Sequence, residues 1–108
     1  MKYEVMANLQ FNTPASEDAL KKALQTQLVG RPTWGETGIA SGIHEVTGKP
    51  EQTFRARFNT ESDMNDIFSW LKTRMDNIPV LSGSVRKHYC DHDEPSPTSC
   101  QILEEYQK

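Results

Sequence analysis

Two kinds of hydrophobic periodicity follow one another along this chain, and their order constrains the fold more than any short motif does. Apolar and polar side chains alternate over residues 3–11, as expected for a strand with one buried face. A weaker alternation covers 38–46, and a clear one returns over 53–59. The segment "SGSVRKHYC" (82–90) has the same period. These four segments are predicted to be strands.

Helical spacing occupies the two longer segments between these strands. In "NTPASEDALKKALQTQLVGRP", leucines and an alanine form one stripe, Ser16 is a candidate N-cap, and Gly30 and Pro32 end the pattern. In "NTESDMNDIFSWLKTRMDNIP", Thr60 can cap a longer amphipathic helix that Pro79 closes. Both segments are therefore predicted to be helices with one face on the core.

The resulting order, β-α-β-β-α-β, predicts an α+β domain of the ferredoxin-like type. Right-handed crossovers place the four strands in the antiparallel order 4-1-3-2, with both helices on one face and the other face open. We assign this domain to residues 1–94. Residues 95–108 form an acidic C-terminal extension that can add a fifth strand. In that register Cys90 faces Cys100 and Arg86 faces Glu104.

Size, charge and the two cysteines narrow the class of protein. The 108 residues suit one domain, and the net charge of -3 gives no broad basic surface for nucleic acid. The chain starts with alternation, and a secretory signal or a membrane span would need a continuous apolar run. We therefore expect a soluble, cytoplasmic protein with free thiols, in which a disulfide is the less favoured state of the cysteines.

The open face of the sheet is the predicted place for function. The outward phase of its strands carries charged and imidazole side chains. The candidate ligand-binding residues are Glu4, His44, Arg55, Arg57, Arg86 and His88. Arg55 and Arg57 suit an anion, although a solvated strand face with cross-strand partners such as Glu4 is the favoured explanation. The inward phase contains one awkward charge, Lys87. The central strands lack outward aromatic side chains, so RNA binding is not expected.

A second candidate is a metal site in "RKHYCDHDEPSPTSC". His88, Cys90, His92 and Cys100 are the residue types that bind zinc. On a straight strand, however, His88 and His92 lie about 13 Å apart at ~3.3 Å per residue, so the ligands do not converge. We therefore expect no metal or other cofactor. A thiolate pair of Cys90 with a neighbouring histidine is geometrically possible.

Three classes of function are compatible with these features. The sequence has no nucleophile elbow, phosphate-binding loop, dinucleotide fingerprint or zinc-protease motif, so an enzyme is not favoured. We favour a non-catalytic module that binds a ligand or a protein through its open sheet face. One alternative is a homodimeric enzyme or ligand binder that resembles the dimeric α+β barrel proteins in fold. The other is a metal-binding or redox-sensing protein.

Overall fold

The computed structural model describes residues 2–33, 37–78, 80–90 and 101–108. The elements, in chain order, are β1 (Lys2–Phe11), α1 (Pro14–Leu28), β2 (Gly38–Ile43), β3 (Pro50–Phe58), α2 (Glu61–Asn77), β4 (Val80–Cys90) and β5 (Gln101–Gln107). The protein is thus of the α+β class, as predicted. Neither helix of the described ranges is both long and apolar enough to cross a membrane.

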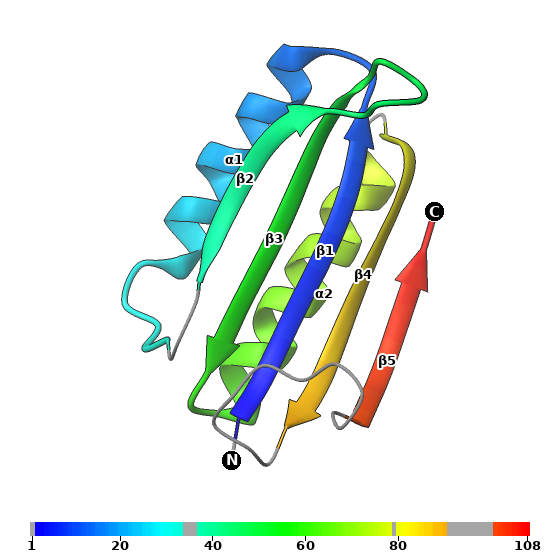
Figure 1. The fold of residues 1–108 in the computed structure, drawn as a ribbon. Helices are drawn as coiled ribbons and strands as arrows, with labels where there is room; N and C mark the ends of the chain where they lie inside the picture. Colours follow the sequence, from blue (N-terminus) through cyan, green and yellow to red (C-terminus); the bar gives the residue numbers. More distant parts are fainter. Residues whose placement is uncertain (1, 34–36, 79, 91–100) are drawn as a thin grey trace.

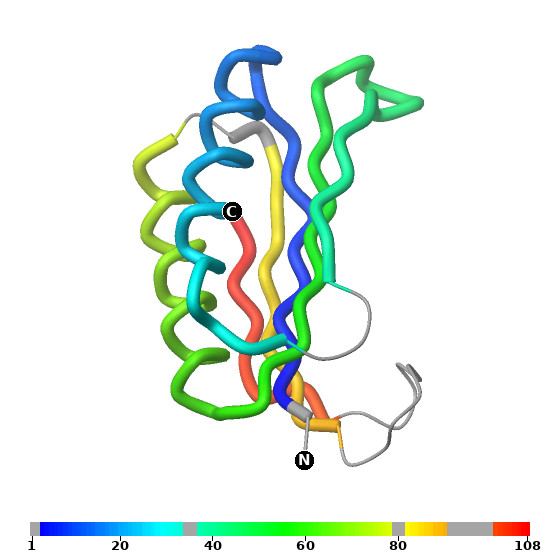
Figure 2. Tube along the Cα trace, turned by 90° about the vertical axis from the view of Figure 1, so that its left-hand side faces the viewer, coloured from blue at the N-terminus to red at the C-terminus, as the bar shows by residue number. Residues whose placement is uncertain are grey.

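All strands belong to one antiparallel sheet in the order β2-β3-β1-β4-β5 (Figure 1). This order differs from the predicted four-strand order because β5 is added beyond β4. Both helices lie on the same side of the sheet (Figure 2). The described elements therefore form two layers, and one sheet face carries no described helix.

Alternation along β1 decides which side chains meet the helices. Val5, Leu9 and Phe11 are buried in the core, whereas Asn8 between them is exposed. The apolar inward residues of β3 and Val85 of β4 join the same cluster, together with the apolar stripe of α2. The buried residues of that stripe are Met64, Ile67, Phe68, Leu71 and Met75. The predicted core phases of these strands and of α2 are confirmed.

Two helix starts test the capping predictions. Thr60 caps α2, and its side chain accepts a hydrogen bond from the backbone N–H of Asp63, as predicted. The prediction of Ser16 as the cap of α1 is wrong. Thr13 takes that role and accepts a bond from the backbone N–H of Ser16. Pro14 explains the earlier start, because proline suits the first helical position.

The β2–β3 turn corrects the predicted place of His44. β2 ends at Ile43 rather than reaching residue 46, and His44 opens the turn. Its Nδ1 accepts hydrogen bonds from the backbone N–H groups of Val46 and Thr47, each at 3.2 Å. Gly48 then takes a positive φ of 69°, which costs glycine little. His44 therefore stabilises a turn and does not lie on the open face of a strand.

β5 pairs with β4 along an irregular register. Tyr89 faces Gln101, but Arg86 faces Glu105 instead of the predicted Glu104. Between His88 and Lys87 the register shifts, and Leu103 is the extra residue on β5. The prediction of a fifth strand is therefore confirmed, and the bulge explains the wrong charge pair.

Lys87 is the inward charge that the alternation left unexplained. Its Nζ donates to Oδ1 of Asn65 on α2 at 2.9 Å and lies 3.5 Å from Oε1 of Glu104. The same nitrogen stands 5.0 Å from the ring centre of Phe68. The charge is thus placed at the junction of α2 and β5. Tyr106 of β5 also reaches α2, through a hydrogen bond from its hydroxyl to Asp76.

Cys90 at the end of β4 is fully buried and disulfide-bonded. The expectation of a free thiol is therefore wrong for this residue. A disulfide-bonded Cys90 also cannot form the reactive thiolate pair with a neighbouring histidine. The chain contains two cysteines, of which Cys100 lies outside the described residues. Stable disulfides are typical of oxidising compartments, so the cysteines give no support to a cytoplasmic location.

The disulfide can be tested by alkylation. Protein prepared without reductant, unfolded in guanidinium and treated with iodoacetamide should show no label on Cys90 in a mass spectrum. The same sample reduced beforehand should be labelled. Cys90→Ala should lower the free energy of unfolding by about 2–4 kcal/mol, since the unfolded chain gains freedom. Labelling of Cys90 without reductant would contradict the assignment.

Candidate functional site

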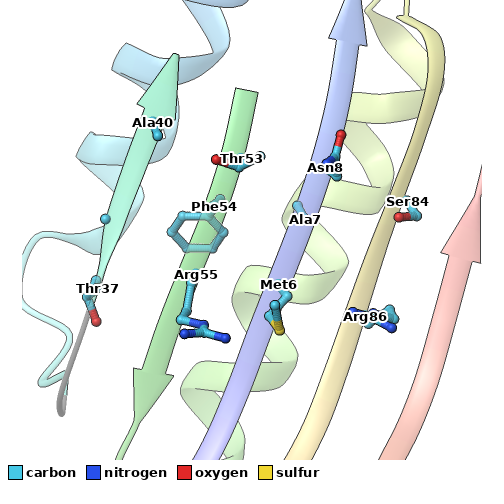
Figure 3. Close-up of a pocket in the computed structure, with 11 residues that line it drawn as sticks. Met6, Ala7, Asn8, Thr37, Ala40, Thr53, Phe54, Arg55, Ser84 and Arg86 are labelled. Carbon is cyan, nitrogen blue, oxygen red and sulfur yellow. The ribbon is translucent and has the colours of Figure 1, made fainter. Parts of the chain in front are cut away.

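A concave pocket of about 600 Å³ lies on the sheet face opposite the helices. It crosses β2, β3, β1 and β4 (Figure 3). Its lining residues are Met6, Ala7, Asn8, Thr37, Gly38, Ala40, Thr53, Phe54, Arg55, Ser84 and Arg86. The volume falls within the range of small-molecule sites, which is roughly 300–1,000 Å³.

The strand register arranges these side chains in rows across the sheet. Met6 is opposite Arg55 on one side and Arg86 on the other. The row therefore holds two guanidinium side chains with a thioether side chain between them (Figure 3). The next row toward the β2–β3 turn places Asn8 between Thr53 and Ser84, an amide between two hydroxyl groups. Cationic and neutral polar groups thus occupy different parts of the pocket.

The small residues of β2 open the side of the pocket. Gly38 stands opposite Arg55, and Ala40 stands opposite Thr53. A Cβ placed on Gly38 would meet no atom within 4 Å. A sheet position with little or no side chain leaves the face beside longer neighbours hollow. The concavity therefore follows directly from the sequence "GIASGI".

A buried charge cluster adjoins the cationic row. Glu4 is opposite Arg57 and His88 in the register. Arg57 donates its Nε–H to Oε2 of Glu4 at 2.8 Å, and Nδ1 of His88 lies 3.3 Å from Oε1. Nε of Arg55 lies 3.6 Å from Oε2. The predicted pairing of the two arginines with Glu4 is therefore confirmed. Glu4, Arg57 and His88 are only 2–3% exposed, however, so the face is not solvated at these three residues.

The surroundings of Glu4 keep it ionised. Burial by itself raises the pKa of the Glu4 carboxyl, but the hydrogen bonds with His88 and Arg57 and the charge of Arg55 outweigh that effect. The pKa therefore lies below its ordinary value of 4.5. The ion pair of Glu4 with Arg57 is thus charged at neutral pH and buried inside the protein. The second ring nitrogen of His88, Nε2, is also buried, and it has no hydrogen-bond partner in the described part of the chain.

The six predicted site residues fall into three places. Arg55 and Arg86 line the pocket, and Glu4, Arg57 and His88 form the adjoining cluster. His44 is in the β2–β3 turn. Thr37, Gly38, Ala40, Thr53 and Ser84 also line the pocket, although none of them was among the predicted site residues; Ala40 and Thr53 were predicted only to point outward. The run of small residues in β2 was the available signal, but it was interpreted only as a weak strand.

One of the four candidate zinc ligands is excluded by the structure. Cys90 is disulfide-bonded and therefore not a thiolate ligand. His92 and Cys100 lie outside the described residues. Among the described residues, no three or more His, Cys, Asp or Glu side chains gather closely enough to hold a metal ion.

Neither the models of known protein families nor the curated proteins match this sequence. The pocket and the charge cluster beside it are therefore the features from which a function can be inferred.

The Glu4 cluster predicts a large difference between two Glu→Gln substitutions. Glu4→Gln should lower the free energy of unfolding by about 3–5 kcal/mol, because it removes the charge of a buried carboxylate that Arg57 and Arg55 share. Glu105→Gln is the matched control. It removes the carboxylate 3.8 Å from Arg86 in a half-exposed pair, and it should cost less than about 1 kcal/mol. Urea unfolding followed by circular dichroism would measure both. Equal losses would refute the buried ion pair.

The same cluster predicts the direction of a pH effect. Since the pKa of Glu4 is lowered by folding, its stabilisation is fully present above pH 4.5 and is lost as the pH falls through the folded value. The stability gap between the native protein and Glu4→Gln should therefore narrow as the pH falls below 4.5. Urea titrations at several pH values from 7 to 3 would follow it. A gap that stays constant over this range would show that folding does not lower the pKa of Glu4.

Proposed function

We propose that this protein is a small-molecule-binding module that uses the pocket on its open sheet face. The observation that carries the proposal is the pocket itself, which combines ligand-like volume, a central apolar Met6 and a few convergent polar groups. The described lining contains no histidine, cysteine or carboxylate, the groups that most often perform acid–base or nucleophilic chemistry. This composition supports binding rather than catalysis.

We also infer that the domain is of the ferredoxin-like type, with β5 as an addition to its β4 edge. The support is the element order β-α-β-β-α-β and the placement of β1 between β3 and β4. Many unrelated functions use this scaffold, so the scaffold does not identify the ligand. The chemical class of the ligand is therefore inferred from the side chains that line the pocket.

A dimer of the α+β barrel type would cover the same face with a second chain. The positions of the exposed large apolar residues favour the small-molecule proposal over this alternative. Among the described residues, the exposed large apolar side chains are those of Val29 after α1, Ile43 and Val46 at the β2–β3 connection, and Ile102 and Leu103 on β5, and none of them lines the pocket. A seam between two sheet faces would need apolar side chains at its centre.

Binding can be tested with N-phenyl-1-naphthylamine, a neutral fluorescent probe of suitable size. We expect saturable binding of one probe per chain, with amide NMR shifts at Met6, Thr53 and Ser84. Ala40→Trp should weaken binding by at least about tenfold, because it fills space where the probe would bury apolar surface. Glu45→Trp, in the exposed turn, is the matched control and should bind normally.

The outcomes separate the alternatives. Shifts confined to the helices, or equal binding by Ala40→Trp and Glu45→Trp, would exclude the pocket as the site. One probe per two chains, together with a dimer in light scattering, would favour the barrel-type homodimer instead.

A further inference from the structure

We infer that the ligand is an amphipathic organic anion, with its anionic group on Arg86 and its apolar body against Met6 and Ala40. This assignment rests on the proposed function and adds the chemical class of the ligand. It follows from three features of the pocket: the exposure and weak pairing of Arg86, the presence of Arg55 in the same row, and the separation of cationic from apolar surface.

The guanidinium group of Arg86 has N–H donors that its described ion pair does not use. Its described ion-pair partner is Glu105, whose Oε2 lies 3.8 Å from Nε, which is longer than a hydrogen bond. Both side chains of this pair are 37% exposed, so water competes with the contact. A guanidinium carries five N–H donors in a planar fork that suits carboxylate, sulfonate or phosphate groups. Arg86 can therefore bind an anion at the pocket without breaking a buried contact.

Arg55 is a second guanidinium group at the same end of the pocket and also belongs to the adjoining cluster. Arg55 and Arg57 approach the same oxygen of Glu4, at 3.6 Å and 2.8 Å, so within this described cluster one carboxylate is shared by two guanidinium groups. Arg55 and Arg57 have further contacts in the fold, so we place the anion on Arg86. Arg55 lines the opposite side of the pocket.

The remaining surface defines the rest of the ligand. Met6 lies between the two arginines, and thioether side chains adapt to irregular apolar ligands. Gly38 and Ala40 leave space on the β2 side. The row of Thr53, Asn8 and Ser84 provides neutral hydrogen-bonding groups farther along the sheet. A bare inorganic anion would leave this space unfilled, so the pocket suits an anion attached to an apolar body.

A matched pair of probes tests the charge requirement. 1-Anilinonaphthalene-8-sulfonate carries the same aromatic skeleton as N-phenyl-1-naphthylamine, plus one sulfonate. We expect the sulfonate to bind about tenfold more tightly at low salt, as a charge-assisted contact implies. Added sodium chloride should reduce that preference, because it screens a partly exposed pair. Inorganic phosphate alone should displace the sulfonate only weakly.

Substitutions locate the anionic group. Arg86→Gln should abolish the preference for the sulfonate, measured as the ratio of the two probe affinities in that variant, whereas Arg86→Lys should keep part of the preference. Arg74→Gln is the matched control, because Arg74 belongs to α2 on the other side of the sheet and packs over Trp70. It should behave like the native protein. Circular dichroism would confirm that each variant is folded.

Each result decides a separate claim. Equal affinity for both probes at the pocket would overturn the anion requirement and leave the proposed function standing. A sulfonate preference that survives in Arg86→Gln would overturn the role of Arg86. Strong displacement by phosphate alone would overturn the need for an apolar body. Failure of both probes to bind at the pocket would remove the proposed function itself.

Discussion

The buried carboxylate of Glu4 is the interaction on which the open face depends. It lies on β1, between β3 and β4, and faces Arg57 on one neighbour and His88 on the other. Moving such a charge out of water is costly unless its partners are in position. A shift of one residue in β1 would turn Glu4 toward the core and Val5 away from it. The ion pair and the apolar core therefore demand the same register.

This agreement explains why the alternating segments were reliable guides to the fold. The period of two in β1 and β3 was reinforced by apolar residues at most of the inward positions, such as Phe11 and Phe58. A register shifted by one residue would turn the polar side chains of these strands toward the core. The predicted sheet and its core face could therefore be derived from the sequence without any knowledge of the packing.

Other features of the structure depend on tertiary contacts, which the hydrophobic periodicity of the sequence does not reveal. The burial of Glu4, Arg57 and His88 is a property of the folded surface, and the same outward phase leaves Asn8 exposed. The bulge at Leu103 depends on the fit of β5 against both β4 and α2, where Tyr106 is fixed by Asp76. His44 was misplaced because a turn that uses its Nδ1 has no distinctive spacing. Local bonds of this kind override a weak strand pattern.

The pocket and the ion pair are linked through Arg55, which contacts Glu4 and also lines the cavity. A ligand anion that approached Arg55 would face the carboxylate of Glu4 nearby and would compete with it for the same guanidinium. At Arg86 the competing carboxylate is Glu105, which is half exposed and more distant from its partner than Glu4 is from Arg57. The less costly exchange is therefore at Arg86. The buried cluster therefore stabilises the sheet, and Arg86 is the arginine that we propose for the ligand.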